Sequence, residues 1–439
     1  MKLKSDTFRS IFTPELEFLA QLFKKHNFEV RIAGGAVRDL LMDVVPADLD
    51  FATTATPQEM YDMFTKEQVR MLNKKGEKHG TVTCRINDKE NFEVTTLRVD
   101  VVCDGRHADV EFTTDWFKDA SRRDLTVNAM FLDLEGNLYD YYNGVDDLNN
   151  RRIRFVGDAE QRIREDYLRI LRYFRFYGRL ARSPTDHQPE TLEAIKRTAQ
   201  GLEGISGERL WVELKKIVTG RFAAPIMRCM AECGVTPYLG LPTALHLDEF
   251  EKAVERTAGM DPKAMTVIPA LLEDESDINA LDRRCKMSSA ERLLGLYIVS
   301  QRYEDSEEDD AKATKRFKDT ILQEVYRPSP GSSASERIFE LLKYQGKREL
   351  LESLRLWSIT KPTFPVNGDV LISKGGLKPG KRLRDALDHL FEYWKARDYE
   401  CGEEVLLSEL ERWRNEKRSA GDRTPSPPLQ KKGKTVTRQ

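Results

Sequence analysis

The residues best suited to chemistry are two carboxylates, Asp48 and Asp50, which follow a glycine turn at Gly34 and Gly35. On a strand, residues two apart project from the same face, so these side chains would lie together. Two like charges held that close need cations, and their hard oxygen atoms suit Mg²⁺, with substrate phosphates completing the coordination. We therefore predict a nucleoside triphosphate site with Asp48 and Asp50 as metal ligands. The alternative is a surface strand with two solvated aspartates.

The glycine turn predicts a phosphate contact. The apolar residues before it predict a strand that ends at the glycine pair, and residues 36–42 predict a short helix. Glycine lets the backbone approach a phosphate and tolerates positive φ, and the amides at a helix start point toward an anion. Gly35 and Arg38 are therefore predicted to hold the triphosphate.

A third carboxylate, Glu93, lies on a segment that alternates like a half-buried strand, residues 92–98. The alternation places Glu93, Thr95 and Leu97 on one face. An acidic residue on a face otherwise made of Thr and Leu fits either a metal ligand or the base for an attacking hydroxyl. Its position alone does not choose between the two.

Four motifs occur in order along the chain. They are Gly34-Gly35-Ala36-Val37-Arg38-Asp39, Asp48-Leu49-Asp50, Arg122-Arg123-Asp124-Leu125-Thr126-Val127-Asn128-Ala129 and Glu165-Asp166-Tyr167-Leu168-Arg169. Each motif alone is a weak signal, but together the chain resembles the class II CCA-adding enzymes. The resemblance is strong over about residues 10–220 and looser to about 415. It implies template-independent addition of CCA to the 3′ end of tRNA, with CTP and ATP as substrates.

The second half of the head carries a further nucleotide contact. Arg123 is predicted to reach the triphosphate, with Asp124 holding that arginine and Asn128 contacting a ribose hydroxyl or the backbone. The alternative is a solvated helix start with a local ion pair. In the polar segment 100–108 the apolar residues follow no regular period, and the segment is predicted to be a surface loop. In the family it corresponds to a flexible loop that helps the change from adding C to adding A.

Ten arginines, four acidic residues and no lysine lie between residues 151 and 182. Arginine at that density favours bidentate contacts to phosphates or bases. Taken as one helix over residues 160–182, the segment has an apolar arc and an opposite charged face. The arc holds Tyr167, Ile170, Leu171, Phe174 and Tyr177, and the charged face holds Glu165, Arg169, Arg172 and Arg175. The alternative is an ordinary solvated face with local ion pairs.

Asp166, at the edge of that face beside Arg169, suggests how bases are chosen without a template. Cytosine and adenine each offer an amino donor beside a ring-nitrogen acceptor, which a carboxylate and a guanidinium can pair. Uracil and guanine offer the reverse pattern and would leave buried groups unpaired. The resemblance assigns the same role to Asp166 and Arg169, and implies that Arg172 and Arg175 also contact the nucleotide.

The predicted fold class is α+β, with a small mixed β-sheet nucleotidyltransferase head and helices, followed by an all-helical neck, body and tail. The predicted parts are a head at 1–150, a neck with the base-selecting helix at 151–220, a body at 221–360, a tail at 361–416 and a disordered basic C-terminus at 417–439. The helix that opens near Gly204 is expected to buttress the base-selecting helix, as in the family.

Composition limits the compartment and the partners. The formal net charge of the 439 residues is only −2, so the overall charge gives no sign of a nucleic-acid partner. The local density of arginine does give such a sign. Six scattered cysteines, without a CxxC pair, predict reduced and mostly buried thiols. We expect neither a membrane span nor a secretory leader. The predicted location is cytoplasmic and nuclear, with a mitochondrial pool as a further option.

Two alternatives to CCA addition stay open. A poly(A)-adding or A-only enzyme of the same superfamily would share the N-terminal motifs. A non-catalytic RNA-binding protein would be expected to lose a carboxylate of the metal site, and here all three are present. The oligomeric state, monomer or homodimer, is open.

Overall fold

The structure is a computed structural model that describes residues 1–72, 80–103, 108–303, 310–328 and 333–421. It divides into two compact units. The first holds Met1–Ser306 with Glu340–Lys347, and the second holds Glu307–Phe339 with Arg348–Gln439. The predicted division into head, neck, body and tail is finer than these units and stays a prediction.

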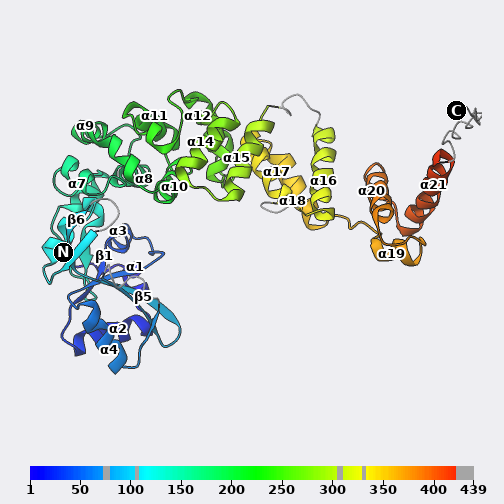
Figure 1. The fold of residues 1–439 in the computed structure, drawn as a ribbon. Coiled ribbons are helices and arrows are strands. Elements are labelled where there is room, and N and C mark those ends of the chain that lie inside the picture. Colours follow the sequence, from blue (N-terminus) through cyan, green and yellow to red (C-terminus); the bar gives the residue numbers. More distant parts are fainter. Residues whose placement is uncertain (73–79, 104–107, 304–309, 329–332, 422–439) are drawn as a thin grey trace, which may run out of the picture. The chain divides into compact units, whose positions relative to one another are not determined.

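The head is built on a seven-stranded mixed sheet in the order β3-β4-β5-β2-β1-β8-β9. Figure 1 labels two of its strands, β1 and β5. The strands of the sheet are β1 (Val30–Ala33), β2 (Asp50–Thr53), β3 (Arg70–Leu72), β4 (Thr81–Ile86), β5 (Glu90–Thr96), β8 (Met130–Leu132) and β9 (Leu138–Asp140). β2 and β5 pair in parallel, whereas the other neighbours are antiparallel. The mixed sheet predicted for the head is thus confirmed.

The parallel pair β2–β5 aligns two of the predicted carboxylates. Asp50 is the register partner of Glu93, and both side chains are exposed. The next residues in each strand, Phe51 and Val94, are buried in the core. Because side chains alternate along a strand, burying this apolar pair holds Asp50 and Glu93 on the opposite, solvent-facing side.

The described part of the head contains six helices, and the helix predicted over residues 36–42 is present as α3, which begins at Gly35. They are α1 (Asp6–Ser10), α2 (Pro14–Lys25), α3 (Gly35–Leu41), α4 (Pro57–Lys66), α5 (Trp116–Ser121) and α6 (Gly144–Asn149), with a 3₁₀ turn η2 (Thr126–Asn128). Thr13 accepts a hydrogen bond from the backbone N–H of Leu16 and is therefore the N-cap of α2. Thr56 and Glu59 form a capping box on α4.

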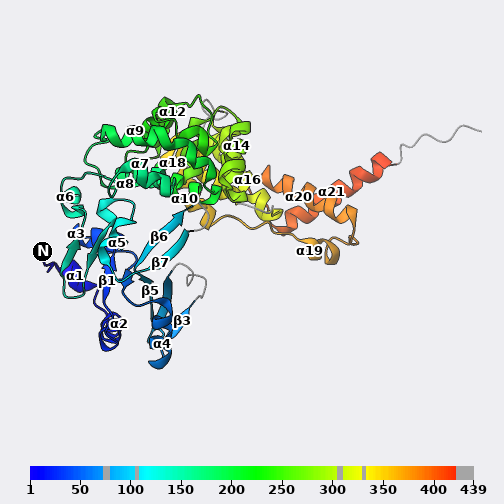
Figure 2. The same cartoon turned by 60° about the vertical axis from the view of Figure 1, so that its left-hand side comes forward.

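The predicted surface loop at 100–108 is wrong for most of its length. β6 (Arg98–Cys103) and β7 (Ala108–Phe112) pair antiparallel in a separate two-stranded sheet that packs on α5 (Figure 2). The segment is rich in valine, and β-branched residues favour extended backbone over an irregular loop. Residues 104–107 lie outside the described part of the chain, so the family's flexible-loop role stays a prediction.

The single helix predicted over residues 160–182 is also wrong. The structure has α7 (Ala159–Glu165) and α8 (Arg169–Leu180), separated by an extended Asp166 with φ −153° and ψ 103°. The carboxylate of Asp166 accepts from the N–H of Leu168, at 3.2 Å. An aspartate that bonds the backbone two residues ahead favours a turn over a continuing helix. The predicted apolar arc still packs, because Ile170, Leu171 and Phe174 are fully buried.

The rest of the first unit is helical and continues the hydrophobic core of the head. Its elements are α9 (Pro189–Thr198), α10 (Gly207–Val218), α11 (Ala223–Glu232), α12 (Leu247–Thr257), α13 (Ala264–Val267), α14 (Glu275–Cys285) and α15 (Ser289–Gln301), with three short 3₁₀ turns, η3 (Ala199–Gly204), η4 (Thr236–Leu239) and η5 (Ile268–Leu271). α10 packs directly on α8, as the predicted buttress requires (Figure 1).

The second unit holds α16 (Asp310–Tyr326), α18 (Arg348–Ile359), α19 (Gly368–Ser373), α20 (Lys381–Lys395) and α21 (Glu403–Gly421), while α17 (Ala334–Gln345) is shared by both units. Its core gathers aromatic side chains around Phe391 and Trp394. Because α21 runs to Gly421, the disorder predicted from residue 417 is wrong for 417–421, where Lys417, Arg418 and Ala420 favour a helix. Residues 422–439 lie outside the description.

The remaining sequence predictions for the chain concern its thiols and membranes. Cys84, Cys229, Cys233, Cys285 and Cys401 are free and buried, as expected for reduced thiols. Within the described ranges, every helix is too short or too polar to span a bilayer.

A half-buried imidazole makes the stability of the first unit pH-dependent. His187 stacks on Tyr177 at 3.7 Å between ring centroids, and its Nδ1 lies 2.9 Å from the Tyr173 hydroxyl. Burial lowers the pKa of His187 to about 4. An unfolded histidine titrates near 6.5, so between these values the unfolded chain binds a proton that the folded protein refuses. Stability is therefore lost as the pH falls from about 6.5 toward about 4.

We expect acidification from pH 7 to pH 5 to lower the free energy of unfolding by about 2 kcal/mol through this group. His187→Asn should flatten that part of the pH dependence in thermal unfolding experiments. His246→Gln, which removes a half-exposed imidazole, is the matched control. An equal pH dependence in unaltered protein and His187→Asn would contradict the assignment.

Candidate active site

A cleft of about 460 Å³ in the first unit brings most of the predicted site residues together. It is lined by Ala33, Gly34, Gly35, Asp50, Phe51, Thr81, Thr95, Arg98, Arg122, Arg123, Asp124, Asn128, Asp166, Arg169 and Arg172. The predicted residues outside this lining are Asp48, Glu93, Arg38, Arg175 and Glu165. Sequence reasoning missed Arg98 and Arg122 as lining residues, although Arg122 stands inside the motif it singled out.

The carboxylate end of the cleft lies at the start of β2. Asp50 is the first residue of that strand, whereas Asp48 lies in a bend before it, so the expectation that both stand on one strand is wrong for Asp48. Although the Asp50 side chain is exposed at the rim of the cleft, the protein around it displaces part of its hydration and raises its pKa; the charge of Asp48 raises the pKa further, and Arg123 acts in the opposite direction. The pair therefore carries like-charge repulsion that a cation would relieve.

The donor set fits a hard divalent cation, because Asp48, Asp50 and the neighbouring Glu93 offer only carboxylate oxygens. In the described part of the chain, no three Asp, Glu, His or Cys side chains already converge into a complete cluster. Two carboxylates plus substrate phosphates are the donor set expected for Mg²⁺ at a nucleotide site.

The glycine turn forms the wall facing Arg123. Gly34 has φ +65°, a conformation that favours glycine, and its N–H donates to the carbonyl of Met130 at 3.1 Å. A Cβ at Gly34 would lie 3.0 Å from Nη1 of Arg123. The turn thus presents bare backbone to the cleft, and a side chain there would strain the backbone and crowd the arginine.

Arg38 supports this turn from beneath. Its guanidinium is 3% exposed and donates to Asp39 at 2.9 Å and to Oδ1 of Asn128 at 2.5 Å. Burial lowers the pKa of Arg38, although Asp39 opposes the shift. Asn128 also donates to Asp124, so the side chain that was predicted to contact a ribose hydroxyl or the backbone is hydrogen-bonded to other side chains in this structure.

Arg123 is held by a carboxylate that the sequence analysis did not select. Asp119, on α5 and 1% exposed, accepts from Arg123 at 3.0 Å, from Arg122 at 2.8 Å and from the backbone N–H of Arg98 at 3.2 Å. Burial raises the pKa of Asp119, but the charges of Arg123 and Arg122 outweigh it, and the pKa is lowered. The i, i+4 spacing of Asp119 and Arg123 was the available signal.

The predicted pairing of Asp124 with Arg123 is therefore replaced by another. Asp124 accepts from Nε of Arg172 at 2.6 Å, across the head and α8. Burial raises the pKa of Asp124, yet the charge and hydrogen bond of Arg172 outweigh it and lower the pKa. The two acidic residues of this region therefore have separate roles. Asp119 orients Arg123, and Asp124 orients Arg172.

The predicted base-reading residues are held by two different partners. Asp166 accepts from Arg209 of α10 at 2.7 Å. Arg169 is buried and donates to Glu165 at 2.7 Å and to the carbonyl oxygens of Arg162 and Arg122, both at 2.8 Å. Arg209 lies far along the sequence, so no local spacing could have identified it.

Two further arginines of α8 bind carboxylates on neighbouring elements. Arg175 donates to both oxygens of the buried Glu213 on α10, at 2.8 and 2.9 Å. Arg179 donates to Asp39 on α3, at 3.0 Å. Arg175 therefore braces α8 against α10, whereas the sequence analysis expected it at the nucleotide.

Two family models match parts of the chain. Residues 30–154 match the family model of the poly A polymerase head domain, and residues 188–243 match that of a probable RNA and SrmB-binding site of polymerase A. A mixed sheet with carboxylates at β2, a glycine turn and an arginine-lined cleft thus defines the chain as a nucleotidyltransferase.

More specific relatives are curated enzymes. The CCA tRNA nucleotidyltransferase 1, mitochondrial, of Homo sapiens is 51% identical over 413 residues, covering 94% of this chain and 93% of that protein. A CCA-adding enzyme of Staphylococcus aureus (strain Newman) is 39% identical over 394 residues, covering 86% of this chain and 92% of that protein. The chain belongs to the CCA-adding enzymes, the CCA tRNA nucleotidyltransferases, as its motifs predicted.

Solved structures agree in fold. The Bacillus stearothermophilus CCA-adding enzyme in complex with CTP has a TM-score of 0.72 and 26% identity, covering 95% of this chain and 100% of that one. The Thermotoga maritima enzyme complexed with tRNA_CCA, at 22% identity and a TM-score of 0.61, covers 92% and 97% and shares the fold. The predicted α+β head followed by helical parts is confirmed.

We expect Asp119→Asn to raise KM for CTP and ATP about tenfold, because Arg122 and Arg123 lose the charge that orients them. Removing one partner of a buried ion pair should also lower the free energy of unfolding by about 3 kcal/mol. Steady-state kinetics with each nucleotide and thermal unfolding measure the two effects. Asp115→Asn, at the exposed N-cap of the same helix, is the matched control. Unchanged nucleotide KM values for Asp119→Asn would show that Asp119 does not position Arg123.

Proposed function

We propose that this chain adds CCA to the 3′ end of tRNA from CTP and ATP, without a nucleic-acid template and with release of pyrophosphate. The observation that carries the proposal is the single cleft that gathers Asp50, the glycine turn, Arg123, Asp166 and Arg169. The curated relatives named for CCA addition support the same reaction.

Asp48 and Asp50 would hold Mg²⁺, and Glu93, the register partner of Asp50, completes the carboxylate set. A divalent metal held by Asp48 and Asp50 would supply the positive charge that lowers the pKa of the RNA 3′-hydroxyl and stabilises the leaving pyrophosphate. The raised pKa of Asp50 supports this assignment, because repulsion between the two aspartates is relieved when a cation binds.

The triphosphate lies against Gly35 and Arg123, with Arg38 fixing the turn from below. The base faces Asp166 and Arg169, whose acceptor and donor match cytosine and adenine and mismatch uracil and guanine. Glu165 positions Arg169, Asp124 positions the cleft residue Arg172, and Arg175 acts through Glu213.

The second candidate is an A-only enzyme, favoured only by the poly A polymerase name of the matching head family. A tRNA transcript lacking its last three nucleotides, supplied with Mg²⁺ and each nucleotide singly and then with CTP plus ATP, separates the two. CCA addition predicts two C followed by one A, with no U or G. A run of A without C would establish the second candidate instead.

We expect Asp50→Asn to lower the rate of addition more than a thousandfold while tRNA binding is retained, because a metal ligand is lost. Asp62→Asn, on the exposed face of α4, is the matched control. Dissociation constants for tRNA are measured beside the rates. Retained activity in Asp50→Asn would remove this residue from the metal site.

We expect Arg209→Gln to lower the ratio of C to U incorporation about tenfold, because Asp166 loses the guanidinium that orients it. Selectivity, measured as the ratio of kcat/KM for CTP and UTP, separates this role from a loss of stability. Lys216→Gln, on the same helix, is the control. An unchanged ratio with a lower folded fraction would mean that Arg209 only stabilises the fold.

The mitochondrial designation of the animal relatives supports a mitochondrial pool of this enzyme. We propose it beside the cytoplasmic and nuclear pools predicted from the sequence. Fractionation of cells that express the endogenous protein tests all three locations.

A further inference from the structure

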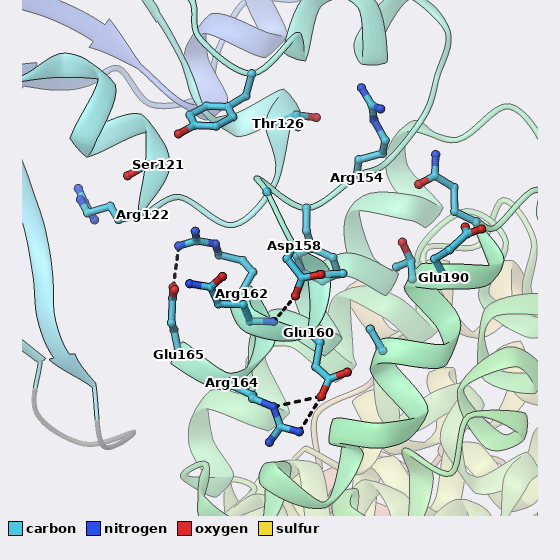
Figure 3. A pocket seen from close by; sticks show the side chains of 18 of the residues that line it. Ser121, Arg122, Thr126, Arg154, Asp158, Glu160, Arg162, Arg164, Glu165 and Glu190 are labelled. Carbon is cyan, nitrogen blue, oxygen red and sulfur yellow. Dashed lines mark hydrogen bonds and ion pairs between the residues drawn. The ribbon is translucent and has the colours of Figure 1, made fainter.

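A second cavity in the first unit adjoins the nucleotide cleft, and most of its lining residues have no role in the mechanism above. It has a volume of about 1250 Å³, against about 460 Å³ for the nucleotide cleft. Its walls come from the end of α5, the turn after β9, α7 and α9 (Figure 3). Five arginines line it, namely Arg122, Arg154, Arg162, Arg164 and Arg197. We call this cavity the arginine pocket.

The arginines in these walls share carboxylates in pairs. Glu160 accepts from Arg164 at 2.7 Å and from Arg197 at 2.8 Å (Figure 3 draws the first contact). Glu165 likewise binds both Arg162 and Arg169, each at 2.7 Å. A guanidinium has five N–H donors, so one shared carboxylate leaves donors available on each side chain. Arg164 and Arg197 are more than half exposed and can turn those donors to a ligand.

The charge of the pocket limits what it binds. Its lining holds the five arginines against four carboxylates, Asp158, Glu160, Glu165 and Glu190. This near balance disfavours a triphosphate, which concentrates several negative charges at one place. It suits a ligand that carries one negative charge per nucleotide, so that its charge is spread over a large volume, as in single-stranded RNA.

One wall of the pocket is aromatic. Tyr141 and Tyr142 line it, and Tyr142 stacks on the half-exposed Phe117 at 5.4 Å between ring centroids. Unpaired bases stack on such side chains irrespective of sequence, and arginine holds the phosphates between them. Stackable rings and guanidinium donors in one cavity are the two features that a single-stranded nucleotide requires.

The arginine pocket also shares a wall with the nucleotide cleft. Arg122 lines both cavities. Glu165, in the pocket, holds Arg169, in the cleft. A polynucleotide whose reacting end lies in the cleft can therefore continue into the pocket.

We propose that the arginine pocket binds the unpaired nucleotides at the 3′ end of the RNA substrate, next to the nucleotide that is extended. This assignment rests on the proposed function for its substrate. The proposal assigns an RNA-binding role to Arg154, Arg162 and Arg164, which belong to the arginine-rich segment but lie outside the nucleotide cleft.

The test measures RNA binding without any nucleotide triphosphate. Two transcripts are compared, a tRNA that ends in its unpaired nucleotide before CCA, and the same tRNA trimmed to a blunt acceptor end. Unaltered protein should bind the first about tenfold more tightly, since stacking and phosphate contacts to one nucleotide are gained. The double variant Arg164→Gln/Arg197→Gln and the variant Tyr142→Ala should each lose most of that preference.

Three controls keep the result specific. Arg151→Gln changes an exposed arginine of the same segment that lies outside the pocket lining, and Tyr142→Phe keeps the stacking ring; both should keep the preference. The dissociation constant for CTP should stay unchanged in every variant. A preference that survives in the double variant and in Tyr142→Ala overturns the proposal, as does a weaker affinity for CTP alone, which would indicate a free nucleotide as the ligand. Failure of the proposed function would instead appear as no extension by unaltered protein.

Discussion

The first unit depends on one repeated interaction, a carboxylate that holds two guanidinium groups. Asp119 binds Arg122 and Arg123, Glu165 binds Arg162 and Arg169, and Glu160 binds Arg164 and Arg197. A guanidinium near a phosphate or base is useful only when its donors point in a fixed direction. The shared carboxylate supplies that direction and leaves an excess positive charge for the substrate.

The same interaction joins the head to the helices that follow it. Asp39 on α3 binds Arg38 beside it and Arg179 of α8, and Asp124 binds Arg172. Ion pairs of this kind add little net stability, because desolvation offsets the attraction, but they fix one arrangement over others. In this protein they set the position of α8 against the sheet, and hence the position of Arg169 relative to Asp50.

The sequence was most informative where function and local pattern coincide. The glycine turn, the carboxylates and the apolar arc of α8 could be predicted, because each rests on alternation or helical spacing within a short segment. Glu93 was placed on the correct face of its strand, and the parallel pairing of β2 with β5 then brought it beside Asp50. What no pattern showed was the choice of partners across elements, such as Arg209 for Asp166 or Asp124 for Arg172. The break at Asp166 was missed because helical periodicity on both sides concealed a side chain that bonds the backbone.

We propose that a carboxylate and a guanidinium, each held by its own partner, read the base in place of a template. A crystal structure of this protein with CTP and Mg²⁺ tests it most directly. We predict that the cytosine amino group donates to Asp166 and that Arg169 donates to the ring nitrogen, while Glu165 still holds Arg169. A cytosine bound elsewhere in the cleft, with Asp166 still engaged only by Arg209, would contradict the account.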